Sequence, residues 1–302
     1  MTATDYEILI DAPTWAFIDA TNRWYPPETA SFTVAQQRAV YDRMCAAFRQ
    51  PRPAGVQVVD RALGGVPCRV YEAGPSRATV LYFHGGGFVV GGLDSHDDVC
   101  AELCAATGLR LVSADYRLAP EHPHPAAFDD ACAATRAAAA EFGGPVLVMG
   151  DSAGGSLAAS VAHALRGRLA LRGVVLIYPA LGGDRSRGSY LTHAQAPMLT
   201  TADVEAYAAL RHGGAEPLAD PRADALRDTD FSGLPPVVIF AAECDPLADD
   251  GPDYAARIAA AGGTARCVTE PGLVHGYLRA RHSVPRAADS FARIIAALAA
   301  LA

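Results

Sequence analysis

Lysine is absent from this chain of 302 residues, so all 25 of its basic residues are arginine. The absence excludes every mechanism that needs a lysine amine: Schiff-base catalysis, the P-loop phosphate site, the ATP site of protein kinases and the Ser-x-x-Lys acylation dyad. Drift from lysine to arginine codons in a GC-rich genome explains this bias better than selection does. The mechanisms stay excluded under either explanation.

Cysteines are few and scattered, and long hydrophobic runs are missing. The seven cysteines form neither a C-x-x-C pair nor a Cys/His ligand group, which is typical of small buried hydrophobes in a reducing compartment. The segment from Met1 to Pro13 carries acids where a secretory signal would have a basic stretch and then an apolar one. No apolar run approaches the ~18 residues of a membrane span. We therefore expect a soluble, cytoplasmic protein with no membrane span.

Positive charge is in deficit, because 33 acidic residues face 25 basic ones and the formal net charge is −8. A net negative chain repels phosphate backbones and lacks the basic patch that nucleic-acid binding requires. We expect no nucleic-acid partner. Hydrophobic residues make up 51% of the chain, which is enough for a large core and predicts a globular protein of enzyme size.

Beyond Pro53 the chain alternates short β-branched runs with alanine-rich helical stretches. The first two runs are separated by a Gly64-Gly65 turn, which is typical of a hairpin. The alternation predicts an α/β fold whose eight-stranded, mostly parallel sheet is flanked by helices. We expect strands at residues 56–60, 68–72, 79–83, 110–114, 146–149, 174–178, 237–241 and 265–269, and helices near 94–107, 126–142, 153–166, 251–262 and 285–301.

Two segments depart from this alternation. Residues 1–50 have helical spacing with a break at Pro26-Pro27, which predicts two helices with a kinked connection. The long interval between the strands at 174–178 and 237–241 contains a second helical stretch at 191–211. We expect residues 1–50 and 185–217 to form a helical cap over a catalytic core made of residues 51–184 and 218–302.

A candidate nucleophile stands at Ser152, in the pentapeptide Gly150-Asp151-Ser152-Ala153-Gly154. This G-x-S-x-G follows an expected strand and precedes an expected helix. A serine on such a turn exposes its hydroxyl at the end of the strand, and the helix N-terminus behind it favours developing negative charge. The alternative is an ordinary glycine turn in which Ser152 caps the helix.

A second glycine cluster, His84-Gly85-Gly86-Gly87, follows the expected strand at 79–83. Three glycines leave backbone N–H groups unobstructed, and acyl transfer through a tetrahedral intermediate needs such donors for its oxyanion. The alternative is a flexible or phosphate-cradling loop. However, the spacing does not fit G-x-G-x-x-G, and the absence of lysine excludes a P-loop.

Ser152 also needs a base and an acid that orients the base. Asp245 stands just beyond the strand at 237–241, and His275 stands in a loop just beyond the strand at 265–269. The order Ser152, Asp245, His275 is that of hydrolases with a serine on a strand-to-helix turn, and it differs from the trypsin and subtilisin orders. We therefore assign these three residues as a catalytic triad.

Nearby acids and a second histidine compete for these roles. Asp249 and Asp250 open the next helix and are expected to serve its N-terminus. Glu243 lies close to Asp245 and remains a competing acid. His282 follows His275 in a polar stretch that leads into a helix, so it is the weaker candidate for the base.

Taken together, the motifs resemble those of the bacterial hormone-sensitive-lipase-like (family IV) esterases. The resemblance spans nearly the whole chain. It implies an α/β-hydrolase core with a helical cap, and carboxylesterase activity on short to medium acyl chains without a cofactor. It also implies that the N–H groups of Gly85, Gly86 and Ala153 form the oxyanion hole. The matching motifs are His84-Gly-Gly-Gly, Asp115-Tyr-Arg-Leu-Ala-Pro-Glu-His122, Gly150-Asp-Ser-Ala-Gly-Gly155, Asp245-Pro-Leu and His275-Gly.

The predicted function is therefore that of a metal-independent serine esterase with a small-molecule ester substrate. Trp24, Tyr25, Met198 and Leu199 of the expected cap are candidates for lining an apolar pocket, although packing of cap against core would explain them equally well. Cleavage of amides, carbamates or lactones by the same triad remains open, as does a monomer or a homodimer. A non-catalytic ligand-binding protein is disfavoured, since no member of the triad is missing.

Overall fold

The structure is a computed structural model that describes residues 4–214 and 219–302. Residues 1–3 of the expected N-terminal cap segment, residues 215–217 of the expected insert and residue 218 of the expected core lie outside these ranges.

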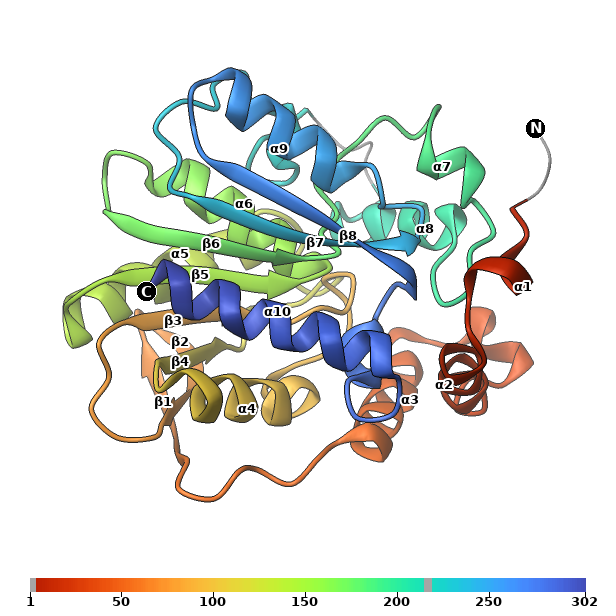
Figure 1. Ribbon diagram of the computed structural model, residues 1–302, viewed down its shortest axis with the longest axis horizontal. Helices are drawn as coiled ribbons and strands as arrows, with labels where there is room; N and C mark the ends of the chain where they lie inside the picture. The colour runs from red at the N-terminus through yellow and green to blue at the C-terminus, as the bar shows by residue number, and fades with distance from the viewer. Residues whose placement is uncertain (1–3, 215–218) are drawn as a thin grey trace.

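One sheet of eight strands forms the centre of the molecule, in the order β1-β2-β4-β3-β5-β6-β7-β8 (Figure 1). β2 pairs antiparallel with β1 and with β4, and all other neighbours pair in parallel. The predicted eight-stranded, mostly parallel sheet is confirmed. The strands are β1 (Gln57–Leu63), β2 (Val66–Glu72), β3 (Thr79–Phe83), β4 (Arg110–Ala114), β5 (Val146–Asp151), β6 (Leu171–Ile177), β7 (Val237–Cys244) and β8 (Ala265–Val274).

Helices cover both faces of the sheet, and each face has its own buried cluster. Central strands are largely apolar for this reason. In β3, Leu81 and Phe83 enter one cluster, while Val80 and Tyr82 enter the other. The first face carries α5 (Ala126–Phe142), α6 (Ala153–Leu165) and α9 (Asp250–Ala260), and the second carries α4 (Asp97–Thr107) and α10 (Pro285–Leu301). No helix in the described ranges is long and apolar enough to cross a membrane.

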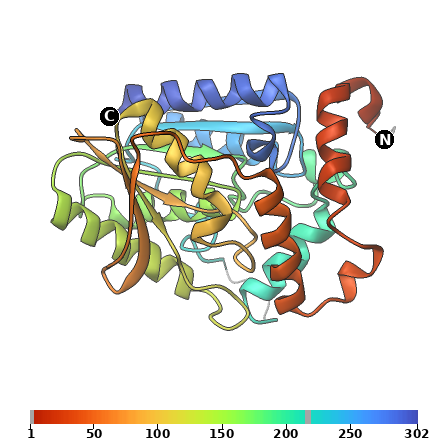
Figure 2. The same ribbon diagram turned by 90° about the horizontal axis from the view of Figure 1, so that it is seen from below.

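The remaining helices gather at the end of the sheet where the parallel strands finish. Figures 1 and 2 show the N-terminal helices beside those that follow β6. The helical stretch expected within 191–211 is α8, which starts where Thr200 and Asp203 form a capping box, and a separate short helix, α7, precedes it. These elements are α1 (Tyr6–Leu9), α2 (Ala12–Asn22), α3 (Val34–Phe48), α7 (Ser189–Thr192) and α8 (Thr201–Arg211), with 3₁₀ turns at Pro27–Ser31, Leu93–His96, Ala225–Arg227 and Tyr277–Ala280.

β7 and β8 extend further than their sequences suggest. The expected end of β8 at Thr269 reflects the following Pro271-Gly272, which usually stops a strand. The two strands instead continue through a register break, in which Ala242 pairs with Glu270 and Cys244 with Val274. Pro271 is tolerated because β8 is the edge strand. The bulge allows β8 to continue past Pro271 to its last residue, Val274.

Asp249 and Asp250 stand at the N-terminus of α9, as expected, but Asp249 makes no side-chain capping hydrogen bond, and both carboxylates bond to another segment. The Asp249 carboxylate accepts the Ser189 N–H at 2.8 Å, and the Asp250 carboxylate accepts the Leu181 N–H at 2.7 Å. The Tyr190 hydroxyl donates to Asp250 at 3.2 Å. Both acids therefore hold the segment that leads from β6 into α7.

Replacing Asp250 with asparagine should flatten the pH dependence of stability. Burial raises the pKa of the Asp250 carboxyl to about 7. The folded state thus keeps a proton that the unfolded chain releases near pH 4, so the free energy of unfolding falls as pH rises from about 4 to about 7. The fall amounts to a few kcal/mol, since one pKa unit corresponds to about 1.4 kcal/mol.

Urea titrations across this pH window measure the effect. Asp253→Asn, an exposed change on the same helix, is the control and should keep the wild-type slope. An Asp250→Asn protein with the wild-type slope would contradict the assignment.

Candidate active site

Ser152 lies on the sharp turn between β5 and α6, with φ of 52° and ψ of −120°. A positive φ is strained for a residue with a side chain, and the Ser152 N–H steadies the turn by donating to the Ile177 carbonyl at 2.9 Å. A Cβ on Gly154 would collide with the carbonyl oxygen of Phe83. The small residues around Ser152 are therefore required by the close packing of this turn against β3.

Ser152, His275 and Asp245 come together from the ends of β5, β8 and β7. His275 Nε2 lies 2.8 Å from Ser152 Oγ, and His275 Nδ1 lies 2.7 Å from Asp245 Oδ2. Asp245 is fully buried, and its other oxygen accepts the Leu247 N–H at 2.9 Å. With Nδ1–H donating to Asp245, Nε2 is left to accept the proton of the serine hydroxyl.

The competing residues are occupied elsewhere. Glu243 accepts the N–H of Gly272 at 2.7 Å, and His282 pairs with Glu102 at 3.0 Å. Glu243 lies two residues before Asp245 in the sequence, and its contact with Gly272 is made at the bulge of β8. The contact joins β7, which ends at Asp245, to β8, which leads to His275. The sequence showed Glu243 only as a competing acid and gave no sign of this positioning role.

The structure of the glycine loop contradicts one of the three expected oxyanion donors, Gly85. The N–H of Gly85 donates to Asp151 Oδ1 at 2.9 Å, so it is not free for an oxyanion. Gly86 and Gly87 line the pocket beside Ser152, and Gly85 does not. Ala153 also lines it, and as the first residue of α6 its N–H has no partner within the helix. The available donors are therefore Gly86, Gly87 and Ala153, and the tripled glycine is the signal that pointed to Gly87.

Asp151 ties the nucleophile turn to this loop. Its buried carboxylate accepts from the Tyr82 hydroxyl at 2.7 Å and lies 3.2 Å from His96 Nε2. Burial works to raise the pKa of Asp151, but His96, the Tyr82 hydrogen bond and the Arg279 charge outweigh it and hold the pKa well below its usual range. Asp151 is thus ionised whenever the protein is folded near neutral pH.

His84 braces its own loop. Its Nδ1 lies 2.8 Å from the Gly85 carbonyl oxygen, and its ring stacks on Tyr116. Burial, with the charge of His96 next, lowers the pKa of His84 to about 4, so this ring is neutral in the working range.

A contact from α3 fixes the far end of the loop. Arg38 Nε donates to the Val89 carbonyl at 2.8 Å, and its Nη2 donates to the Ala119 carbonyl at 2.9 Å. The Ala119 N–H in turn donates to the Phe88 carbonyl at 2.8 Å. The N-terminal helices are thereby connected to the segment that follows the glycines.

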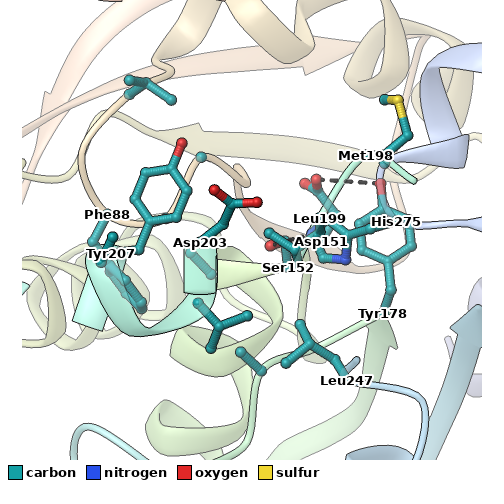
Figure 3. A pocket seen from close by; sticks show the side chains of 18 of the residues that line it. Phe88, Asp151, Ser152, Tyr178, Met198, Leu199, Asp203, Tyr207, Leu247 and His275 are labelled. Carbon is teal, nitrogen blue, oxygen red and sulfur yellow. Dashed lines mark hydrogen bonds between the residues drawn. The ribbon is translucent and has the colours of Figure 1, made fainter. Parts of the chain in front are cut away.

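A cavity of about 610 Å³ opens above Ser152. In Figure 3, Phe88 and Tyr207 lie on one side of Ser152, and Met198 and Leu247 lie on the other. Tyr25, Met198 and Leu199, three of the four residues expected to line a pocket, do so. Mainly apolar walls of this size suit an organic ester.

Trp24 is the exception, because it does not line the cavity and is 38% exposed. α2 ends at Asn22, and the following turn sends consecutive side chains in different directions. Tyr25 faces the cavity and Trp24 faces solvent. The sequence offered both aromatic residues as candidates for lining a pocket, because it did not reveal which way each side chain points after α2 ends.

The described residues contain no group of three or more His, Cys, Asp or Glu side chains arranged to hold a metal ion.

Comparison with known proteins places this geometry in a family. Residues 80–279 match the family described as the alpha/beta hydrolase fold. Carboxylesterase NlhH of Mycobacterium tuberculosis is 41% identical over 251 residues, which cover 78% of this chain and 78% of that protein. Esterase LipI of the same species is 40% identical over 287 residues, which cover 86% of this chain and 87% of that protein.

Solved structures agree with the sequence relatives. The ester-hydrolase EH1AB1 from the metagenome of Lake Arreo superposes with a TM-score of 0.88 at 33% identity, over 97% of this chain and 99% of that one. The Pyrobaculum calidifontis esterase gives a TM-score of 0.84 at 29% identity, over 97% and 99% of the two chains. The predicted kinship with hormone-sensitive-lipase-like esterases is confirmed, and the chain belongs to the α/β-hydrolase fold family.

Proposed function

We propose that this protein is a serine carboxylesterase that hydrolyses short to medium acyl-chain esters through an acyl-enzyme on Ser152. The observation that carries the proposal is the hydrogen-bonded series Asp245, His275 and Ser152 at the base of the cavity, beside the free N–H groups of the glycine loop. The names of the relatives, carboxylesterase and esterase, support the same reaction class.

In the first half of the reaction, His275 Nε2 takes the hydroxyl proton of Ser152 as Oγ attacks the carbonyl carbon of the ester. The electron pair of the C=O bond moves to oxygen, and the N–H groups of Gly86, Gly87 and Ala153 stabilise that oxyanion. The tetrahedral intermediate collapses when His275 gives its proton to the leaving alcohol. The acyl group remains on Ser152.

In the second half, His275 takes a proton from water, whose oxygen attacks the acyl carbon. The new intermediate releases the carboxylic acid, and the proton returns to Ser152 Oγ. Asp245 accepts the Nδ1–H throughout, which keeps the ring in the useful tautomer and stabilises the imidazolium that forms in each half.

We further propose that residues 1–50 and 185–217 act as a cap over the core of 51–184 and 218–302. Support comes from the cavity walls, because Thr21 of α2, Tyr41 of α3 and Tyr207 of α8 line the space above Ser152. The core supplies the reacting groups, and the cap supplies walls that the acyl or alcohol part must fit.

Rates on aryl esters from acetate upward, with one amide and one lactone of similar size, test the substrate class. Esters should be turned over fastest, with a maximum at short to medium chain length. A lactone or amide preferred over every ester would move the protein to another hydrolase class with the same triad.

Ser152→Ala should lower kcat on an aryl ester by at least about 10⁴-fold, because the attacking oxygen is removed. It should also abolish labelling by a fluorophosphonate. Ser160→Ala on the same helix is the matched control, since its hydroxyl is buried without a hydrogen-bond partner among the described residues. A folded Ser152→Ala protein that keeps its turnover would end the proposal.

Asp245 and Glu243 should respond differently to loss of charge. Asp245→Asn should cost about 10⁴-fold in kcat, because the amide favours the wrong tautomer of His275. Glu243→Gln keeps an oxygen for the Gly272 N–H and should retain most activity. Glu243→Ala loses that acceptor, loosens the bulge before His275, and should cost about 10- to 100-fold.

Steady-state kinetics with circular dichroism separate these effects from unfolding. His275→Ala combined with Asp245→Asn should be no worse than His275→Ala alone, since the triad acts as a unit. If Glu243→Gln were as inactive as Asp245→Asn, the assignment of the acid would be wrong.

Tyr25→Ala should alter chain-length preference, whereas Trp24→Ala should not. Tyr25 faces the cavity and Trp24 faces solvent, so only the first change removes apolar wall that longer acyl chains would contact. We expect KM for the longer esters to rise several-fold in Tyr25→Ala while acetate turnover stays near wild type. Equal profiles for the two variants would argue against substrate contact by the N-terminal segment.

A further inference from the structure

Arg211, the last residue of α8, lines the same cavity as Ser152, although its side chain is only 8% exposed. A guanidinium carries five N–H donors and no acceptor. Removing such a group from water is costly unless its donors find partners. The surroundings of Arg211 therefore show what the cavity is built to hold.

In the part of the chain that the structure describes, these donors are left unused. The nearest carboxylate oxygen, on Asp224, is 3.7 Å from Arg211 Nη1, which is beyond hydrogen-bond distance. Within residues 4–214 and 219–302 the guanidinium donates no hydrogen bond. Its flat face instead lies over the Phe88 ring, 3.7 Å from the ring centre. This cation–π contact fixes the plane of the group while its N–H edge stays unbonded.

Arg279 shows the contrast, because it lines the same cavity and has hydrogen-bond partners there. Its Nη1 donates to the Ser95 carbonyl at 3.0 Å, and its Nη2 donates to the Tyr41 hydroxyl at 2.8 Å. Both terminal nitrogens of Arg279 are thus bonded. Arg211 is held in place by Phe88, and its terminal nitrogens bond to no group among the described residues.

The charge around Arg211 allows it to act as a donor at neutral pH. Burial lowers its pKa to about 10, so the guanidinium stays protonated. Asp224 is close enough to offset part of the charge. Asp220 is already bonded to Arg222 at 2.8 Å and to His124 at 3.1 Å, so it does not compete.

The position of Phe88 places this donor group near the reacting centre. Phe88 directly follows Gly86 and Gly87, which line the cavity beside Ser152 and are the proposed oxyanion donors. When the glycine loop holds the carbonyl of a substrate, Arg211 is therefore within reach of a substrate atom that lies a few bonds from that carbonyl. Arg211, Phe88 and Asp224 are called the Arg211 subsite below.

We propose that the Arg211 subsite binds a second oxygen acceptor of the substrate, so the preferred esters carry a carboxylate, ketone or ether oxygen along their chain instead of plain alkyl. This inference rests on the proposed esterase function. A carboxylate gives the strongest fit, because its two oxygens match the guanidinium fork. Substrate choice then depends on a polar contact inside an otherwise apolar pocket.

Ethyl esters of equal acyl length test the proposal. Ethyl pentanoate, ethyl 4-oxopentanoate and monoethyl glutarate differ only in the far end of the acyl group, which is alkyl, ketone or carboxylate. The succinate and adipate monoesters vary its distance. A second pair, butyl butyrate and the butyrate ester of 4-hydroxybutyrate, tests a carboxylate at the far end of the alcohol part in the same way. Release of acid is followed by pH-stat titration.

We expect at least one oxygenated ester to exceed its alkyl match in kcat/KM, and Arg211→Met to lower that preference by about 10- to 100-fold. Arg211→Met keeps the apolar stem, and ethyl pentanoate measured on the same variant is the internal reference for that preference. Arg211→Met with Asp224→Asn removes both charges and should show the same loss without leaving the Asp224 carboxylate unpaired. Arg187→Met, on the exposed surface, is the charge-matched control.

An intact enzyme that prefers the alkyl ester in every pair overturns the subsite, and this result needs no variant to fold. So does a preference for oxygenated esters that survives in folded Arg211→Met. In both cases Ser152-dependent turnover of ethyl pentanoate leaves the esterase function standing. If the intact protein hydrolyses none of these esters, the proposed function itself fails.

Discussion

The carboxylate of Asp151 is the fixed point on which the active-site geometry depends. It stands at the end of β5, next to Ser152, and receives hydrogen bonds from Tyr82 of β3 and from the Gly85 N–H. The loop proposed to stabilise the oxyanion is thereby held at a set distance from Ser152. An ionised group can do this because His96 and Arg279 offset the cost of its burial.

A similar arrangement positions the other half of the machinery. Three parallel strands end at one edge of the sheet, but parallel pairing alone would bring Asp245 and His275 to the edge without fixing their spacing. The register break between β7 and β8, with Glu243 bonded to Gly272 across it, adjusts that spacing until Nδ1 meets the carboxylate. Asp151 and Glu243 thus act alike, since each is an acid whose acceptor oxygens are used by backbone N–H groups of a neighbouring segment.

The sequence predicted the features that depend on residue patterns, and it missed the features that depend on where a side chain points in the folded protein. The strands of the sheet, the positions of Ser152, Asp245 and His275, and the glycine loop all follow from periodicity and from residues that only certain turns tolerate. The use of the Gly85 N–H by Asp151 could not be read from the sequence, because it depends on where a carboxylate points after folding. Trp24 and Tyr25 are adjacent in sequence and face different ways for the same reason. Arg211 carries no sequence signal, because its proposed role follows from its place in the cavity and from the hydrogen bonds it does not make with the described residues.

The attachment of Arg38 to the segment after the glycines has a consequence for motion. Arg38 belongs to α3 and donates hydrogen bonds to the Val89 and Ala119 carbonyls. A displacement of α3 is therefore transmitted to the loop that holds the proposed oxyanion donors. The pocket cannot widen on that side without weakening the catalytic arrangement. If substrate entered by an outward movement of α3, the enzyme would therefore be inactive while α3 is displaced and active again once α3 returns.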